Sequence, residues 1–145
     1  MNFSKTIIFL AVAAVALATS RAAETDGQVE ARKVALDLAG AFSNEGFKIR
    51  DGHWAGEIKV GEQAFLAVNL YAGNQYWFSV GANEGSKTFA VHVFDETGKP
   101  VTTENYEDAE KAAAGFSPTI SGQYFVSIEP SQGEGSTYCL VYSYK

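Results

Sequence analysis

The strongest constraint on the fold is a two-residue alternation of apolar side chains that runs from Trp54 almost to the end of the chain. Successive side chains of a strand point to opposite faces, so runs of this kind indicate half-buried strands. Three such sets are Tyr76, Phe78 and Val80, then Phe89, Val91 and Val93, and finally Tyr124, Val126 and Ile128. Glycine-bearing turns separate the runs at short intervals. We therefore predict an antiparallel β-sandwich of about eight strands over residues 47–144.

One stretch before these runs follows a helical period instead. Between residues 27 and 44 the apolar side chains that share one side of a helix are Ala31, Val34, Ala35, Leu38, Ala41 and Phe42. Thr25 or Asp26 is suited to cap the first turn, and Gly46 is suited to end the helix. Val29 and Leu36 lie off this apolar stripe, so we expect the helix to touch more than one surface.

Residues 1–22 have the pattern of a secretory signal peptide. Lys5 precedes an apolar run from residue 7 to residue 18, and small residues follow it. The run is too short to span a bilayer and no second long apolar run follows, so we expect no membrane insertion. We expect cleavage to leave residues 23–145 as a single domain, either secreted or periplasmic.

The charge of the chain excludes one class of partner. It has 11 basic and 17 acidic side chains and a net charge of −6, and removal of residues 1–22 takes away Lys5 and Arg21 but no acid, which leaves −8. Nucleic acids and anionic membranes are bound largely through clustered positive charge. We therefore expect no nucleic-acid partner.

Several runs share a particular arrangement of turns and strand ends. They are Gly56-Glu57-Ile58, residues 65–70, Ala72-Gly73-Asn74-Gln75-Tyr76, Val91-His92-Val93-Phe94-Asp95 with Gly98, Phe116-Ser117-Pro118, and Ser121-Gly122-Gln123-Tyr124-Phe125-Val126. Over about residues 54–144 this arrangement resembles the bacterial pre-peptidase C-terminal domain. The resemblance implies a jelly-roll-like sandwich that accompanies secreted enzymes as a non-catalytic accessory module. It also implies binding of extracellular polymers such as collagen or polysaccharide, as some relatives do.

The candidates for nucleophilic catalysis are few. Such an enzyme would need Cys139 or a serine beside one of the two histidines, His53 and His92. Cys139 lies within the last alternating run with its side chain opposite to that of Leu140, and buried strand thiols are generally unreactive. The chain has no G-x-S-x-G motif. We expect no enzyme; the alternative is a small secreted hydrolase that uses a carboxylate pair or one of the histidines.

The acidic side chains are weak candidates for a metal site. His53 has only Asp51 close to it in the sequence, whereas zinc takes three or four ligands. The charged, alanine-rich stretch from Glu104 to Ala114, which we interpret as a helical turn or an ordered loop, includes Glu107 and Asp108 without the ligand spacing of a calcium loop. We expect no cofactor, with calcium on loop carboxylates as the alternative.

Aromatic side chains occupy strand positions that should be polar. They are Trp77, His92, Phe94 and Phe125. Burial of one such ring contributes roughly 1.5–3 kcal/mol, so an exposed group of them needs a partner. Either this surface binds sugar rings or peptides, or the helix covers it as a lid. We favour the lid, because the helix must bury its apolar stripe. Trp54 and Tyr71, near strand ends, are weaker binding candidates.

We thus expect a secreted binding or accessory module that contacts another protein or an extracellular polymer, either polysaccharide or matrix protein. A structural envelope protein that pairs through Cys139 is a further alternative, and the oligomeric state is left open. The tyrosines of the last run, Tyr138, Tyr142 and Tyr144, can be half-buried with wet hydroxyl groups and need no ligand.

Overall fold

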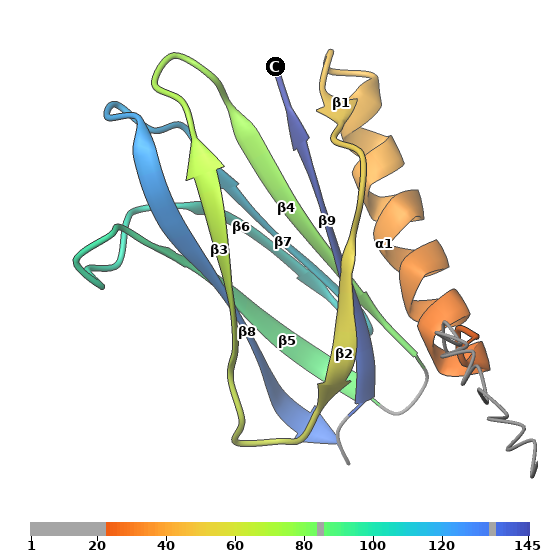
Figure 1. Cartoon of the computed structure of the whole chain (residues 1–145). Coiled ribbons are helices and arrows are strands. Elements are labelled where there is room, and N and C mark those ends of the chain that lie inside the picture. The colour runs from red at the N-terminus through yellow and green to blue at the C-terminus, as the bar shows by residue number, and fades with distance from the viewer. Residues whose placement is uncertain (1–22, 84–85, 134–135) are drawn as a thin grey trace, which may run out of the picture.

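The computed structural model describes residues 23–83, 86–133 and 136–145, and the predicted signal peptide lies outside this part of the chain. Within the described residues the protein has one helix and nine strands, which form two antiparallel sheets (Figure 1). The prediction of a mostly β fold with one N-terminal helix is confirmed. No helix in the described ranges has the length and apolar character needed to cross a membrane.

The two sheets differ in size. The larger sheet contains β1 (Lys48–Ile49), β2 (Trp54–Ile58), β4 (Tyr76–Ala82), β6 (Glu104–Asp108), β7 (Lys111–Phe116) and β9 (Ser136–Tyr144). Its order is β1-β9-β4-β7-β6, and β2 also pairs with β9. The smaller sheet contains β3 (Ala64–Leu70), β8 (Gly122–Gly133) and β5 (Ser86–Phe94), in the order β3-β8-β5. We call them the six-stranded and the three-stranded sheet.

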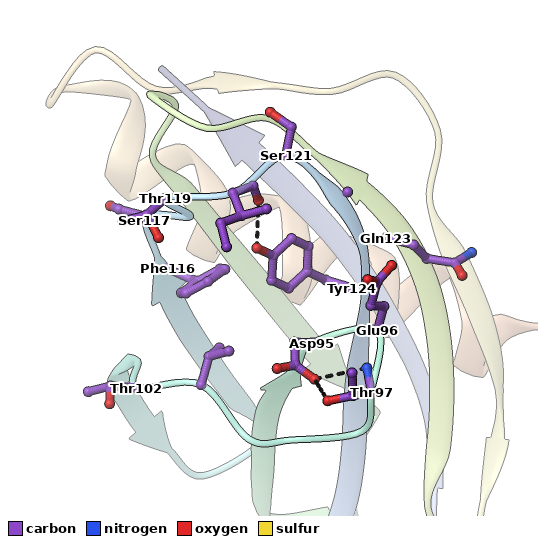
Figure 2. A pocket seen from close by; sticks show the side chains of 13 residues that line it. Asp95, Glu96, Thr97, Thr102, Phe116, Ser117, Thr119, Ser121, Gln123 and Tyr124 are labelled. Carbon is purple, nitrogen blue, oxygen red and sulfur yellow. Dashed lines mark hydrogen bonds between the residues drawn. The ribbon is translucent and has the colours of Figure 1, made fainter.

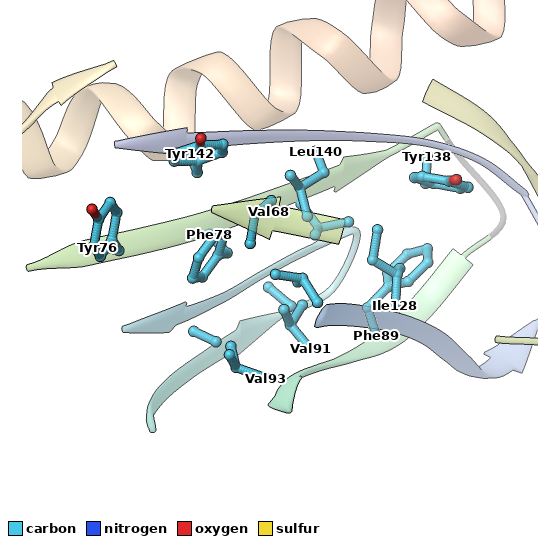
Figure 3. Packing of buried hydrophobic residues seen from close by; sticks show 14 of the residues in the cluster. Val68, Tyr76, Phe78, Phe89, Val91, Val93, Ile128, Tyr138, Leu140 and Tyr142 are labelled. Atoms are coloured by element: carbon cyan, nitrogen blue, oxygen red, sulfur yellow. The ribbon is translucent and has the colours of Figure 1, made fainter. Parts of the chain in front are cut away.

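The hydrophobic core lies between the two sheets, as the alternation predicts (Figure 3). The three predicted sets all belong to one buried cluster, with β4 supplying one set, β5 the second and β8 the third. Phe78, Val80 and Val126 are fully buried in it. Each such side chain contributes roughly 1.5–3 kcal/mol to stability, so the packing of both sheets against this cluster holds the fold together.

The helix α1 (Asp26–Ser43) begins and ends where local chemistry places its boundaries. Thr25 is the N-cap, and it forms a capping box with Gln28: the Thr25 side chain accepts from the Gln28 N–H, and the Gln28 side chain accepts from the Thr25 N–H. After the C-cap residue Asn44, Gly46 has a φ of +90°, a conformation that side chains with a Cβ rarely adopt. The predicted helix is confirmed, with Thr25 rather than Asp26 as its cap.

The helix packs on the outer face of the six-stranded sheet, against β4 and β9 (Figure 1). The buried helix residues Ala31, Ala35 and Ala39 form a second apolar cluster with Cys139 and Val141 of β9. Both surfaces are lined by small side chains, so the helix backbone lies close to the sheet. A Cβ atom built on Gly81 of β4 would lie only 2.5 Å from the carbonyl oxygen of Ala31.

Two expectations about the helix and the middle of the chain are wrong. Val29 and Leu36 are exposed to solvent, so α1 uses one face only. Residues 104–116, expected to be a helical turn or loop up to Ala114, form a hairpin of β6 and β7. Ala112 and Ala114 face the core, and Ala113 is also buried. Burial on both faces of β7 and pairing with β4 and β6 therefore override the helix propensity of alanine here.

The strands are also longer than the sequence pattern suggests. Glycine and serine are frequent in residues 81–86 and 130–136, a composition typical of loops, yet β4 extends to Ala82, β8 extends to Gly133, and β9 starts at Ser136. Pairing across neighbouring strands continues into both stretches: Ala82 pairs with Tyr138, and Pro130 with Phe89. The glycine and serine content that signals a loop therefore lies partly within paired strands.

Candidate functional site

The six side chains predicted to bind a ligand lie on three separate parts of the molecule. Trp77 lies on the helix-covered side of the six-stranded sheet, where its ring stacks on that of Phe42 with centroids 4.3 Å apart and planes 8° apart. The predicted helical lid is therefore present over Trp77, and this ring packs within the protein.

His92, Phe94 and Phe125 lie on the outer face of the three-stranded sheet, on the opposite side of the molecule from the helix. Phe65 of β3 joins them: its ring centroid lies 6.2 Å from that of Phe94, and the His92 ring lies 6.5 Å from Phe94. We call these four residues the aromatic face. The helix does not reach it, so the predicted lid is wrong for His92, Phe94 and Phe125, because they belong to a different sheet from Trp77.

The aromatic face covers a polar group. Ser127 of β8 pairs with Phe65 on one side and with His92 on the other, so its side chain lies on the same outer face. It is fully buried, and its hydroxyl group forms no hydrogen bond with any described residue. A buried hydroxyl without a partner costs about 1–3 kcal/mol. Phe65, by contrast, is 56% exposed. The face thus combines an exposed apolar ring with an unsatisfied donor beneath it.

Trp54 and Tyr71 are associated with a hollow at one end of the sandwich, near the turn between β3 and β4. Its volume is about 330 Å³. It is lined by Arg50, Asn69, Tyr71, Asn74, Tyr76, Tyr142 and Tyr144, and we call it the tyrosine pocket. Trp54 packs behind it, with its ring stacked on Tyr142 at a centroid distance of 5.7 Å. The pocket draws its residues from both sheets and from the segments beside β1 and after β3.

Two buried tyrosines form the inner wall of the pocket. Tyr76 and Tyr142 are only 4% and 3% exposed, and both lie at the same end of the core (Figure 3). The hydroxyl oxygen of Tyr76 accepts hydrogen bonds from the backbone N–H of Tyr71, at 2.9 Å, and from Nδ2 of Asn74, at 3.1 Å. These bonds tie the turn after β3 to the core, so the pocket is held in shape by the fold.

Arg50 supplies the positive charge of the pocket. Its guanidinium group donates a hydrogen bond to the hydroxyl group of Tyr142 and lies 5.2 Å from the centroid of that ring. Burial raises the pKa of Tyr142, and the nearby Arg50 charge only partly opposes this effect. The phenol is therefore neutral at physiological pH and retains its proton as a donor.

The exposed rings complete the pocket. Tyr71 is 63% exposed and Tyr144 is 39% exposed. Sequence reasoning singled out Tyr71 and Trp54 but missed Arg50, Tyr76 and the two asparagines. It also assigned the tyrosines of the last run a purely structural role. The available signal was the cluster of asparagine and tyrosine around the turn of residues 69–76, which lies directly after an alternating run.

A second hollow, of about 410 Å³, lies between the turn after β5 and the loop before β8 (Figure 2). Asp95 lies at its edge, but its carboxylate is used within the turn: it accepts from the Thr97 hydroxyl, at 2.6 Å, and from the N–H groups of Thr97 and Lys99. These bonds, the Thr97 hydroxyl first, lower the pKa of Asp95. The hydroxyl group of Tyr124 donates a hydrogen bond of 2.6 Å to the Ile120 carbonyl oxygen, so it too is engaged within the protein.

The candidate catalytic side chains do not come together. His53 lies 3.5 Å from the Glu24 carboxylate, which also pairs with Arg32 at 2.7 Å, whereas His92 lies on the three-stranded sheet. Cys139 is buried under the helix, and burial raises its pKa to about 11. Across the described ranges, no group of at least three His, Cys, Asp or Glu side chains is placed to hold a metal ion.

The comparisons with known proteins add no family to this description. No protein-family model matches the chain, and no curated protein is significantly similar to it.

Proposed function

We propose that the protein is a secreted, non-catalytic binding module that holds an extracellular polysaccharide in the tyrosine pocket. The observation that carries this proposal is the composition of the pocket: exposed tyrosine rings stand beside hydrogen-bonding groups that the fold already positions. The volume of about 330 Å³ lies within the range of small-ligand sites, about 300–1,000 Å³.

A sugar has the two chemical features that such a pocket recognises. Its C–H faces pack against aromatic rings, and its hydroxyl groups both donate and accept hydrogen bonds. Tyr71 and Tyr144 offer exposed rings, and Asn69 and Asn74 offer amide groups that can donate and accept. Because Asn74 is bonded to the buried Tyr76, little side-chain freedom is lost when a ligand binds.

The proposed architecture is the jelly-roll-like sandwich that the resemblance to pre-peptidase C-terminal domains implies, and the proposed role is that of an accessory module. Support for a non-catalytic role comes from the separation of His53 and His92 and from the buried, protonated Cys139. The aromatic face favours a second candidate function, contact with another protein, because interfaces are enriched in aromatic residues that are exposed in the free chain.

The experiment compares retention of the protein on a panel of immobilised extracellular polysaccharides, using wild type and three variants. Tyr71→Ala removes an exposed ring of the pocket, and Phe65→Ala removes an exposed ring of the aromatic face. Tyr106→Ala, on β6, is the matched control, because Tyr106 is 41% exposed and lines neither site. Each variant is checked by circular dichroism for an unchanged fold.

We expect Tyr71→Ala to weaken retention about tenfold or more, which corresponds to roughly 1.4 kcal/mol, while Phe65→Ala and Tyr106→Ala bind as wild type does. Loss of retention in Phe65→Ala alone would move the site to the aromatic face. If no polysaccharide retains the wild type, the polysaccharide function is wrong.

A further inference from the structure

We infer that the tyrosine pocket selects sugars that carry a carboxylate, such as uronic acids, and that Arg50 recognises the carboxylate. This inference rests on the proposed function and deepens it by naming the class of sugar. It follows from the charge of the pocket, the hydrogen-bond directions inside it and the way in which Arg50 is held.

The pocket has the opposite charge to the chain that contains it. Its lining includes one cation, Arg50, and no Asp or Glu side chain, although the chain as a whole carries a net charge of −6. The ion pairs among the described residues involve Arg32, Lys33, His53 and Lys111, and Arg50 is in none of them. A positive charge without an anionic partner in a hollow is complementary to an anion.

The guanidinium group of Arg50 is positioned before a ligand arrives. It is held by the hydrogen bond to Tyr142 and by the proximity of that ring, 5.2 Å from centroid to guanidinium carbon. The bond to Tyr142 uses one of its N–H donors and leaves the others for a ligand. Guanidinium groups bind carboxylates through paired, parallel hydrogen bonds, a geometry that a sugar hydroxyl group cannot match.

The inner wall of the pocket also favours acceptors over donors. The oxygen of Tyr76 already accepts two hydrogen bonds, from Tyr71 and Asn74, so its own proton is what remains for a ligand. The hydroxyl oxygen of Tyr142 accepts a hydrogen bond from Arg50, so the proton of this hydroxyl group is likewise left to donate to a ligand. No described residue accepts the proton of either hydroxyl group. An oxygen-rich anion would satisfy both donors together with Arg50, whereas a cation would find no Asp or Glu side chain in the lining and would be repelled by Arg50.

The exposed rings identify the carrier of the carboxylate as a sugar. A bare anion would use Arg50 and the two phenols alone and would leave Tyr71 and Tyr144, 63% and 39% exposed, without a role. A pyranose ring places its apolar face on such rings while its C6 carboxylate extends toward a cation. The pocket therefore fits a uronic acid unit better than a neutral sugar or a free anion.

The test uses two series of oligosaccharides, galacturonate and mannuronate oligomers, each measured beside its own methyl ester. The ester keeps the ring and the linkages but removes the negative charge. Affinities are measured by titration calorimetry, and the emission of Trp54, which stacks on the pocket residue Tyr142 from behind, gives a second readout. Sodium acetate and sodium sulfate serve as free-anion competitors.

We expect at least one acidic oligomer to bind about tenfold or more tightly than its ester, and we expect this preference to weaken between 0.15 and about 1 M salt. Arg50→Met should abolish the preference, and Arg50→Lys, which keeps the charge but not the paired geometry, should retain part of it. Lys59→Met, which removes a positive charge near the turn between β2 and β3, should leave the preference unchanged.

The possible failures are distinguishable. If an ester and its acid bind equally tightly to the wild type, the inference is wrong while the proposed polysaccharide function stands. If neither binds and the polysaccharide panel is also negative, both are wrong. If acetate or sulfate competes as well as the acidic oligomer on a molar basis, the pocket is a simple anion site and the inference is overturned.

Discussion

At the scale of single residues, the Asp95 carboxylate organises the turn after β5. It accepts three hydrogen bonds from the turn that contains Thr97 and Lys99, and these bonds lower its pKa below the ordinary value of 3.8. A carboxyl group with a lowered folded pKa stabilises the fold above its unfolded pKa, and the contribution disappears as the pH falls through the folded pKa. The charge of Asp95, not its shape alone, therefore supports the turn.

Asp95→Asn tests this interpretation. We expect the variant to melt at a lower temperature than wild type at pH 7, because the amide keeps the shape of the side chain but lacks the charge. The difference should shrink as the pH falls below about 4, where the wild-type carboxyl group also becomes neutral. Thermal melts between about pH 2.5 and 7 measure it, with the exposed neighbour Glu96→Gln as the control. A difference that stays constant with pH would contradict the interpretation.

For single residues, the sequence predicted which side of a strand a side chain occupies, but not which sheet the strand joins. Alternation correctly placed Leu140 in the core and Cys139 on the opposite side of β9. It placed Trp77 and Phe94 on outward positions, but it did not reveal that they lie on different sheets. Strand pairing decides which outward positions share a surface, and pairing is a tertiary property. The tyrosine pocket escaped prediction for the same reason, since Arg50 and Tyr142 are 92 residues apart in the sequence.

At the scale of elements, the position of α1 on the six-stranded sheet depends on the close approach of its backbone to Gly81 of β4. A Cβ on Gly81 would lie 2.5 Å from the Ala31 carbonyl oxygen and 2.8 Å from the Val34 Cβ, and it would also clash with the Ala35 backbone nitrogen. Backbone atoms cannot move aside as a flexible side chain can, so the helix itself would have to shift.

We therefore expect Gly81→Ala to lower the free energy of unfolding by roughly 1–3 kcal/mol, the usual cost of overpacking. Gly122→Ala, at the start of β8, is the matched control, because no atom lies within 4 Å of a Cβ there. Urea denaturation provides the measurement. The Trp77 emission should also shift to longer wavelength in Gly81→Ala, because Phe42 would be displaced from its ring. Equal stability of the two variants would mean that the helix backbone does not pack closely against Gly81.

The strands and the helix differed in how well local sequence predicted them. The alternating strands and the capped helix were predictable, because their signals are local. The hairpin of β6 and β7 was not, since an alanine-rich sequence favours helix unless tertiary packing overrides that propensity. For β7 the packing comes from the core on one side and from the helix side of the sheet on the other.

At the scale of the whole molecule, the two outer faces have different composition. The outward positions of β4 and β9 under the helix are mostly small: Ser79, Gly81, Cys139, Val141 and Ser143. The outward positions of the three-stranded sheet include the rings of Phe65, Phe94 and Phe125. An alanine-rich helix packs closely only on small residues, and this contrast selects the face that it covers. The small and the aromatic outward residues can both be identified in the sequence, but only the assignment of strands to sheets shows that they form two separate faces.

In the described part of the chain, the helix covers the outer face of the six-stranded sheet, whereas the tyrosine pocket and the aromatic face stay accessible. The most direct test of this arrangement compares the reactivity of two thiols toward a maleimide reagent at neutral pH. One is native Cys139, under the helix, and the other is Ala67→Cys in a Cys139→Ser background, in the middle of the aromatic face beside Phe125. Both chains are also labelled in urea, where the two rates should be equal.

The arrangement predicts that the thiol at position 67 reacts at a rate close to that of a small free thiol, because Ala67 is exposed. Cys139 should react only through unfolding, because it is fully buried and its pKa is raised to about 11. Rapid labelling of Cys139 in the folded protein, or protection of the thiol at position 67, would contradict the central claim that the helix covers the six-stranded sheet and leaves the aromatic face open.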